Sequence, residues 1–519
     1  MRRLVIASAL AASLACSSNG TSPPATGPLT VTTDKGVVQG SSDGTARQFL
    51  GIPFAAPPVG ALRFMPPAPA TPWTTPLVAN HFAPACPQLT SSGSVSPTSN
   101  EDCLYLNVWA PDADVKNAPV FVWIYGGGYI TGNGADPMYN GENLAADKGV
   151  VVVTLNYRLG PLGFLSHPAF AAAEGVTTSP SQGLLDQQAA LRWVKTNIAA
   201  FGGDPNNVTL AGESAGAVSV CSQLAMPGSN GLFAHAVIES GLCASLPMLF
   251  QAPAPAEAQG NRMATALGCT DANTALSCMQ GKTTDEVLTA LPLRHALFGP
   301  TGENYTPVLD GSALPLAPGA AIKAGSFAKV PTIIGSNLNE GQLFLWLWGS
   351  PPPTSTDVRS ALGVLVDASS VDTIATKYAV DTDPTTAFVD ILDDVMTCLA
   401  RSTARTLAGA GAPTYLYHFA YPFQVAAIPG AVTTHGFELP FVFRNTAFGQ
   451  QLTDADLAVA DLVDGYWFSL AQSGAPTGTI AWPAYAASSD QDLEIDSTAS
   501  VATGLKSSIC DFWDPFLPE

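Results

Sequence analysis

The sequence predicts an α/β fold in which a central, mostly parallel twisted sheet carries helices on both faces. Residues 120–124 and 150–155 are continuous apolar runs, which are typical of strands buried on both faces of a parallel sheet. Between Gly183 and Phe201 the apolar residues recur at helical spacing, and Gly202 follows as a stop signal. Strands that alternate with helical patterns favour a doubly wound sheet over a sandwich or a helical bundle.

The other strands are expected on both sides of these runs. Alternating residues at 29–33 and 36–40 predict a small antiparallel hairpin, and residues 104–109 predict another alternating strand. Between them, residues 49–64 are expected to form a proline-rich crossing segment, because they lack a helical period. Further sheet strands are expected at residues 208–210, 236–239, 331–334 and 415–419.

Two long segments look like additions to this plan. Residues 247–329 and 350–413 are expected to be inserted helical and loop material, of the kind that commonly roofs a site at the edge of such a sheet. We find no internal repeat and no break in composition. Residues 29–519 are therefore expected to form a single enlarged α/β domain.

Composition and charge narrow the choice of partners. The 519 residues are 47% hydrophobic and 12% charged, which is enough apolar content for a large core. The formal net charge of −20 at pH 7 argues against nucleic acid and anionic membrane surfaces, since both would be repelled. A neutral or cationic small molecule is the expected partner, although net charge does not determine the field inside a pocket.

The N-terminus predicts export. Residues 1–15 join a basic start to a short apolar run and are expected to be a signal peptide. They lead into Ser13-Leu14-Ala15-Cys16, which resembles a bacterial lipobox with Cys16 as the lipid attachment site, and residues 16–28 are expected to carry that anchor on a flexible tether. Membrane contact is expected only through this anchor. Ser13 is less usual than leucine there, so a secreted protein is the alternative to a cell-envelope lipoprotein.

Eight cysteines remain after Cys16, and an even number suits an oxidising compartment. Short sequence separation favours Cys86 with Cys103 and Cys269 with Cys278. The remaining cysteines are hypothesised to pair as Cys398 with Cys510 and Cys221 with Cys243. No C-x-x-C pair or histidine-rich cluster accompanies them, so a metal site is not expected.

Residues 212–216, Gly-Glu-Ser-Ala-Gly, lie between a predicted strand and an apolar run at 217–224 that predicts a helix. The pattern G-x-S-x-G between strand and helix is typical of a nucleophile elbow, in which Ser214 occupies a strained turn. A serine hydroxyl is a weak nucleophile without a base. Because the five-residue pattern also arises by chance, its partners elsewhere in the chain decide its meaning.

The order serine, acid, histidine that accompanies such an elbow leaves few candidates. His435 lies in an irregular loop beside a glycine, whereas His418 lies in an alternating run and is interpreted as a packed strand histidine. Glu340 directly follows the strand at 331–334, at the edge where α/β sites assemble, and is the expected acid. Asp310 is the competitor, and we interpret it as a turn residue.

An oxyanion site requires backbone donors. Gly126, Gly127 and Gly128 directly follow the strand at 120–124, and a glycine run lets successive N–H groups point into one concavity. A simple turn is the alternative interpretation, but it does not need three glycines. The expected donors are the amides of Gly127, Gly128 and Ala215.

Together these motifs resemble the type-B carboxylesterases, the cholinesterase-like esterases and lipases of the α/β-hydrolase fold. The resemblance covers nearly the whole mature chain. It rests on residues 49–64, 101–107, 125–128, 156–158, 183–187, 201–205, 212–216, 339–341 and 435–436.

The resemblance implies a triad of Ser214, Glu340 and His435. It also implies three disulfides, Cys86–Cys103, Cys269–Cys278 and Cys398–Cys510, and two structural ion pairs, Arg63–Glu101 and Arg158–Asp186. One departure is that residues 87–102 contain no aromatic side chain, whereas the corresponding loop of cholinesterases carries a tryptophan that binds quaternary ammonium. A preference for choline esters is therefore not expected.

The implied function is a serine carboxylesterase that cleaves a small ester through an acyl-enzyme, without a metal or organic cofactor. Activity is expected to fall as His435 becomes protonated, at about pH 6 to 7. A lipase acting on long-chain acylglycerols and a non-catalytic recognition module are the alternatives. Phe344, Trp346 and Trp348 follow the acid and are expected either to line a hydrophobic pocket or to pack in the core.

Overall fold

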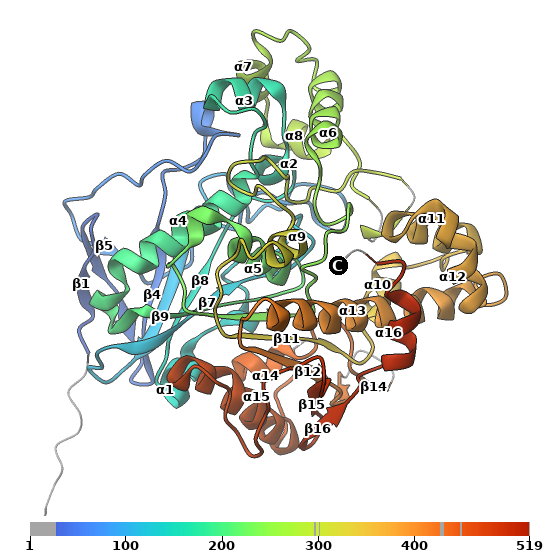
Figure 1. Cartoon of the computed structure of the whole chain (residues 1–519). Helices are drawn as coiled ribbons and strands as arrows, with labels where there is room; N and C mark the ends of the chain where they lie inside the picture. The colour runs from blue at the N-terminus through green and yellow to red at the C-terminus, as the bar shows by residue number, and fades with distance from the viewer. Residues whose placement is uncertain (1–26, 295–296, 300, 426–429, 447–448, 518–519) are drawn as a thin grey trace, which may run out of the picture.

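The computed structural model describes residues 27–294, 297–299, 301–425, 430–446 and 449–517. The predicted signal peptide and Cys16 lie outside the described residues. A mixed sheet of eleven strands runs through the described part (Figure 1). In spatial order its strands are β16 (Ala499–Thr503), β15 (Gln491–Ile495), β12 (Thr414–Phe419), β11 (Thr332–Asn337), β10 (His235–Glu239), β9 (Gly203–Glu213), β7 (Ala118–Ile124), β8 (Val151–Leu155), β6 (Tyr105–Pro111), β4 (Ala46–Pro53) and β3 (Ser41–Ser42).

The centre of this sheet is parallel, as the apolar runs predicted. β8, β7, β9, β10, β11, β12 and β15 pair in parallel, and antiparallel strands complete both edges. All five residues of β8 and the last five of β7 are buried. Strands covered on both faces need apolar side chains on both sides, which explains why these two strands are almost entirely apolar.

Two strand predictions near the N-terminus had different outcomes. The hairpin is confirmed as β1 (Thr30–Thr32) and β2 (Val37–Gln39), with β5 (Leu77–Val78) beside β2. The crossing segment is wrong for its first part, because β4 is a buried strand of the main sheet. Gly51, at φ +73°, lies at an irregularity in the β4–β6 register, and its N–H donates to Asn107 Oδ1 at 2.9 Å. The bulge at this glycine interrupts the alternating pattern, so the strand was not recognised from the sequence.

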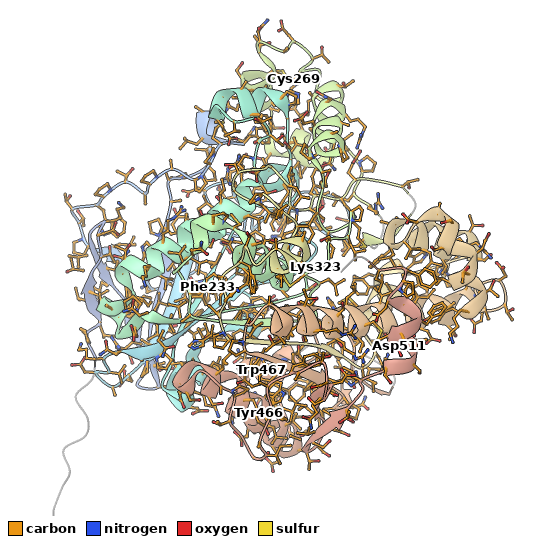
Figure 2. The ribbon with its side chains drawn as sticks, viewed as in Figure 1. Phe233, Cys269, Lys323, Tyr466, Trp467 and Asp511 are labelled. Carbon is orange, nitrogen blue, oxygen red and sulfur yellow. A yellow bond between two sulfur atoms is a disulfide. The ribbon has the colours of Figure 1, made fainter. Side chains whose placement is uncertain are left out.

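Helices cover both faces of the sheet (Figure 1). α4 (Gln182–Asn197), α5 (Ala215–Ala225) and α13 (Pro384–Gly409) lie on one face, and α1 (Glu142–Lys148), α14 (Leu439–Phe443) and α15 (Asp454–Ser473) lie on the other. The predicted helix at 183–201 is confirmed as α4 with one following 3-10 turn, and Gly202 ends it at φ +100°. Trp467 of α15, labelled in Figure 2, donates its Nε1–H to Glu239 Oε1 at 2.7 Å and so links the helix to the end of β10.

The expected insertions are only partly separate from the sheet. α6 (Pro253–Ala266), α7 (Ala275–Gln280) and α8 (Thr284–Thr289) form one projection, and α11 (Ser355–Leu365) with α12 (Val371–Lys377) forms another (Figure 1). α13, which was expected to belong to an insertion, packs on β11 and β12 as a sheet-covering helix. Its buried face includes Ile391, Val395 and Leu399, so it is part of the hydrophobic core.

The remaining elements are short. They are η1 (Gly60–Leu62), η2 (Pro137–Tyr139), α2 (Gly160–Phe164), α3 (Pro168–Glu174), η4 (Pro227–Ser229), α9 (Pro318–Lys323), α10 (Gly341–Trp348), η6 (Ala368–Ser370), β13 (Phe423–Gln424), β14 (Ala431–Val432) and α16 (Ser507–Trp513). β15 and β16, which the sequence analysis missed, extend the sheet beyond β12.

All four predicted disulfides are formed, namely Cys86–Cys103, Cys221–Cys243, Cys269–Cys278 and Cys398–Cys510. Cys221–Cys243 ties α5 to the segment after β10, and Cys398–Cys510 ties α13 to α16. In the described part of the chain, no helix is both long and apolar enough to cross a bilayer. No group of three metal-ligating side chains occurs in those same residues.

Candidate active site

Ser214 occupies the turn between β9 and α5. Its backbone has φ 56° and ψ −124°, a conformation that costs a non-glycine residue about 1–3 kcal/mol. A Cβ at Gly216 would lie 2.0 Å from Ile124 O, and one at Gly212 would lie 2.6 Å from the Gly216 carbonyl carbon. Gly212 and Gly216 therefore have no room for a side chain. The strand–turn–helix geometry predicted for residues 212–216 is present.

Glu340 and His435 meet at the carboxyl edge of the sheet. Glu340 directly follows the loop after β11, is fully buried, and accepts a hydrogen bond from His435 Nδ1 at 2.6 Å. Its second oxygen accepts from Ser240 Oγ at 2.7 Å and from the Asn337 N–H at 2.6 Å. Three donors thus fix this carboxylate, and they orient the imidazole through it.

The other imidazole nitrogen of His435, Nε2, lies near Glu213, the residue that precedes Ser214. His435 and Ser214 line the same cavity of about 470 Å³. His435 Nε2 lies 3.2 Å from Glu213 Oε1 and has no hydrogen-bond partner among the described residues. A general base needs a nitrogen without another hydrogen-bond partner on a residue that shares the cavity of the nucleophile, and His435 meets this condition.

The glycine run after β7 forms part of the same cavity wall. Gly127 and Gly128 have φ values of +103° and +61°. A Cβ at Gly127 would lie 2.3 Å from Thr131 O, so no other residue fits at this position. Ala215 is the first residue of α5, and the first N–H groups of a helix have no partner within it. Backbone donors from two elements are therefore available beside Ser214.

The rest of the cavity wall is mostly apolar. It is lined by Ile130, Met138, Leu297, Leu343, Phe344, Leu347, Phe437 and Leu439, with Asp136, Glu213 and Arg294 as charged members. Phe344 packs 5.0 Å from the His435 ring. Trp346 packs against Phe437 with tilted rings and is partly exposed, whereas Trp348 packs on Phe388. The aromatic run after Glu340 therefore divides between a cavity wall, a surface and the core.

Buried acids dominate the electrostatics of the site. Burial raises the pKa of Glu213 to about 7. Burial, followed by the charges of Glu213 and Glu340, raises the pKa of Glu438 to about 8. Burial lowers the pKa of His435, but the nearby carboxylates of Glu213 and Glu340 outweigh it and raise the pKa to about 9. The site therefore stabilises an imidazolium.

Three polar residues of this edge were missed from the sequence. Ser240 follows β10, Asn337 ends β11, and Glu438 lies three residues after His435. The Asn337 side chain donates to Glu438 Oε2 and, at 2.8 Å, to Thr434 O. The rule that sites assemble at the carboxyl ends of parallel strands could have found the first two.

The rejected candidates have structural roles. Asp310 accepts backbone N–H groups of Ser312, Ala313 and Leu314, which is the turn role that we predicted. His418 is buried within β12, and burial lowers its pKa to about 4.

The two ion pairs implied by the resemblance are both formed. Arg63 Nε donates to Glu101 Oε2 at 2.7 Å, and Arg158 Nη2 donates to Asp186 Oδ1 at 2.7 Å. None of these four residues lines the cavity of Ser214.

Comparison with known proteins identifies the family. The model of the carboxylesterase family matches residues 27–513. The chain is 36% identical over 487 residues to the para-nitrobenzyl esterase of Bacillus subtilis (strain 168), covering 91% of this chain and 95% of that one. It is 35% identical over 538 residues to carboxylesterase 1D of Rattus norvegicus (94% and 93% covered), and 34% identical over 549 residues to the acetylcholinesterase of Bungarus fasciatus (96% and 88% covered).

Solved structures agree with the sequence matches. A para-nitrobenzyl (PNB) esterase structure superposes with a TM-score of 0.81 at 32% identity, covering 93% of this chain and 98% of that one. A thermophilic PNB esterase gives the same TM-score and identity, with 93% and 99% covered. The chain therefore has the α/β-hydrolase fold and belongs to the carboxylesterase family of carboxylic ester hydrolases.

Proposed function

We propose that this chain hydrolyses carboxylic esters by two-step acyl transfer at a triad of Ser214, His435 and Glu340. The observation that carries the proposal is the buried 2.6 Å hydrogen bond between Glu340 and His435, whose free Nε2 belongs to the cavity that Ser214 also lines. The carboxylate keeps Nδ1 protonated, so that Nε2 is the nitrogen available as a base.

In the first step Ser214 Oγ attacks the ester carbonyl carbon while its proton passes to His435 Nε2. The carbonyl oxygen becomes an oxyanion that accepts hydrogen bonds from the amides of Gly127, Gly128 and Ala215; one such donor contributes about 3 kcal/mol. His435 then gives its proton to the departing alcohol. Water, deprotonated by the same imidazole, attacks the acyl-enzyme and releases the acid. No metal or organic cofactor enters these steps.

The cavity supports esters with an apolar acyl or alcohol part, because most of its lining is aliphatic or aromatic. One observation favours lipase action as a second candidate. Leu347 of α10 lines the cavity yet is 54% exposed, and Trp346 beside it is 37% exposed. Such an apolar rim suits contact with an insoluble ester. Activity on a triacylglycerol that rises abruptly above the solubility limit would support this candidate, and a smooth saturation curve would oppose it.

We also propose that the protein is exported. Four disulfides suit an oxidising compartment. Residues 1–15 would be removed as a signal peptide and Cys16 would carry the lipid, with release into the medium as the alternative. Mass spectrometry of the mature N-terminus distinguishes a diacylglycerol-modified Cys16 from an unmodified start. A Cys16→Ser variant would move from the envelope to the medium only if the lipid anchors the protein.

The proposed mechanism is tested with short-chain 4-nitrophenyl esters. Ser214→Ala should lower kcat by at least about 10⁴-fold and abolish the burst of nitrophenol. Ser222→Ala is a matched control, because Ser222 lies on α5 and donates to the Val218 carbonyl away from the cavity. A Ser214→Ala variant that keeps both the burst and the turnover would refute the proposed nucleophile.

A further inference from the structure

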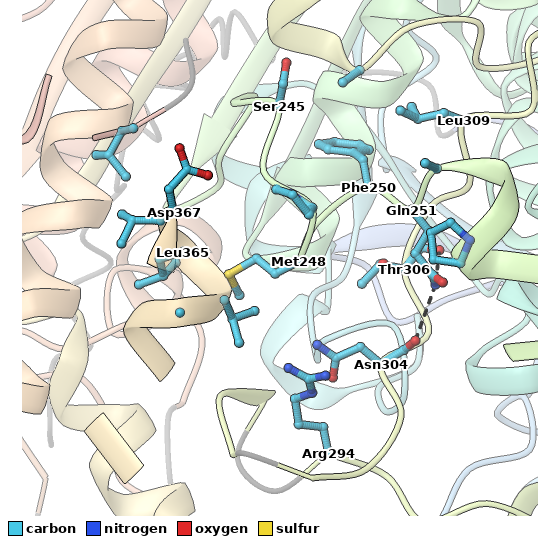
Figure 3. Close-up of a pocket in the computed structure, with 18 of the residues that line it drawn as sticks. Ser245, Met248, Phe250, Gln251, Arg294, Asn304, Thr306, Leu309, Leu365 and Asp367 are labelled. Carbon is cyan, nitrogen blue, oxygen red and sulfur yellow. Dashed lines mark hydrogen bonds between the residues drawn. The ribbon is translucent and has the colours of Figure 1, made fainter. Parts of the chain in front are cut away.

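A second, larger cavity adjoins the active site. It has a volume of about 1070 Å³ and is walled by the segment after β10, the start of α6, residues 303–309, the end of α11 and residues 515–517 (Figure 3). Arg294 lines both this cavity and the 470 Å³ cavity of Ser214. Its side chain therefore lies at the boundary between the reacting centre and the larger space.

The guanidinium of Arg294 is not hydrogen-bonded in the described part of the chain. Among the described residues its side chain forms neither a hydrogen bond nor an ion pair, and its Nε is buried without an acceptor. A buried donor left without an acceptor is destabilising. An acceptor brought by a ligand would remove that destabilisation.

A second donor lies near the same point. Arg294 and Asn304, both labelled in Figure 3, line the larger cavity. The backbone holds them in place, since the Arg294 N–H donates to Glu303 O at 2.9 Å and the Glu303 N–H donates to Pro292 O at 2.8 Å. A guanidinium beside a carboxamide presents several N–H groups in one direction, which is the donor set that a carboxylate accepts.

Glu303 is the acid of the larger cavity whose charge acts on Arg294, and its carboxylate is bound by two other side chains. Arg262 binds Glu303 through two contacts of 2.8 Å, and Gln259 donates to the same carboxylate at 3.0 Å. These two charges offset each other, and Asp367, the other acid of the larger cavity, is exposed. On the side of Ser214, Asp136 and Glu213 repel anions. An anionic group is therefore favoured at Arg294 rather than deeper in the active site.

We propose that Arg294 and Asn304 form a subsite for a carboxylate carried by the substrate at the end remote from the scissile ester. The substrate class is then half-esters and other esters with one free carboxylate, such as monoalkyl esters of dicarboxylic acids. This inference rests on the proposed function of Ser214. The net charge of −20 favours a neutral or cationic substrate, whereas this subsite favours an anionic one. A fixed guanidinium attracts an anion at contact distance, but the overall field of the protein is screened by salt.

The test is a panel of ethyl esters of equal length that differ only at the far end of the acyl chain: monoethyl suberate, ethyl octanoate and an ester ending in trimethylammonium. A second panel of acetate esters carries the same three groups on the alcohol. In the native enzyme, kcat/KM should be highest for the carboxylate member of at least one panel. Arg294→Gln should lower the carboxylate-to-methyl ratio of kcat/KM at least tenfold, and Arg294→Lys should restore part of it.

Arg192→Gln is the matched control, because it removes the same charge from an exposed position on α4 that lines neither cavity. It should leave the ratio within twofold of the native value. The subsite is refuted if Arg294→Gln leaves the ratio unchanged in both panels, or if the trimethylammonium member is preferred by native enzyme and variant alike.

A binding measurement separates this inference from the mechanism. Calorimetry with the N-ethyl half-amide of suberic acid, which lacks an ester, should show binding to Ser214→Ala that weakens at least tenfold when Arg294→Gln is added. If that weakening is seen while Ser214→Ala still turns over esters, the subsite stands and the proposed nucleophile fails. If binding does not depend on Arg294 while Ser214→Ala is inactive, the mechanism stands and the subsite fails.

Discussion

The centre of the sheet and its carboxyl edge differ in what they bury. Ile333 and Ile334, in the middle of β11, are completely buried among apolar neighbours. At the carboxyl ends of the same group of strands, Glu213, Glu239 and Glu340 are buried almost as completely. Apolar burial stabilises the fold, whereas an ionised carboxylate away from water costs several kcal/mol unless donors compensate it.

The hydrogen bonds at this edge are distributed unevenly among the buried acids. Glu340 accepts three hydrogen bonds, but Glu213 Oε1 and Glu239 Oε2 accept none from the described residues. Burial accordingly raises the pKa of Glu239 well above its ordinary value. We infer that the centre of the sheet stabilises the fold, whereas its edge is less stable because it holds one hydrogen-bonded carboxylate beside His435. Four substitutions can break or sharpen this comparison.

The largest effect is expected from Glu340→Gln. The amide cannot hold His435 in the tautomer that leaves Nε2 as a base, so kcat on a short-chain ester should fall about 10³–10⁴-fold. The thermal midpoint should stay within a few degrees of the native value, because a buried charge is removed together with its hydrogen bonds. Stopped-flow kinetics and calorimetry measure the two quantities. A native kcat in this variant would remove Glu340 from the mechanism.

Ile333→Ala should give the opposite pattern on the same strand. Truncating a fully buried isoleucine costs about 2–5 kcal/mol of unfolding free energy, through lost burial and a residual cavity. The ratio kcat/KM should change less than threefold, since Ile333 does not line the cavity of Ser214. Chemical denaturation provides the free energy. A large fall in kcat/KM with little change in the free energy of unfolding would contradict the division between centre and edge.

Asp492→Asn tests a buried carboxyl that is far from the site. Asp492 lies on β15 with neither oxygen hydrogen-bonded among the described residues, and burial raises its pKa to about 6. When folding raises the pKa of an acid, the folded protein becomes less stable as pH rises from below the unfolded-state pKa through the folded-state pKa. The asparagine variant should therefore be more stable than the native protein at pH 8, by about 2 kcal/mol, with the difference vanishing near pH 3.5. Equal stability at pH 8 would show that the buried charge is compensated.

The smallest expected effect is a shift in pH dependence. The sequence alone predicted loss of activity at about pH 6 to 7, but the acids around His435 raise its pKa to about 9 and should move the acid limb of kcat/KM upward. Glu213→Gln removes the largest of the raising charges, so the limb should move down by about one pH unit. Asp136→Asn, an exposed acid of the same cavity, is the control and should move it less. An acid limb that does not respond to Glu213→Gln would show that His435 is not the titrating base.

The parts of the site that local motifs define could be predicted from the sequence. Ser214, Gly127 and Gly128 lie in patterns whose backbone geometry only particular residues allow, and the order of the chain selected Glu340 and His435. Ser240 and Glu438 were missed because they act through hydrogen bonds to residues about 100 positions away. Arg294 was missed because its place between two cavities depends on the pairing of residues 292–294 with Glu303.

The fold was predictable where burial is uniform and less so where it is irregular. The unbroken apolar runs correctly predicted β7 and β8. β4 was hidden by its glycine bulge, and α13 was assigned to an insertion together with the rest of residues 350–413. β15 contains two acids in five residues and was not predicted. Tertiary contacts determine whether these three segments form strands or helices of the core. Those contacts cannot be inferred from a single sequence.

The most direct test of the account is covalent labelling of the native enzyme with diisopropyl fluorophosphate, followed by peptide mass spectrometry. We predict one adduct per chain, located on Ser214, and a labelling rate at least 10³-fold lower in His435→Ala. An adduct on another residue, or labelling of Ser214 at an undiminished rate in His435→Ala, would contradict the claim that the two side chains act together.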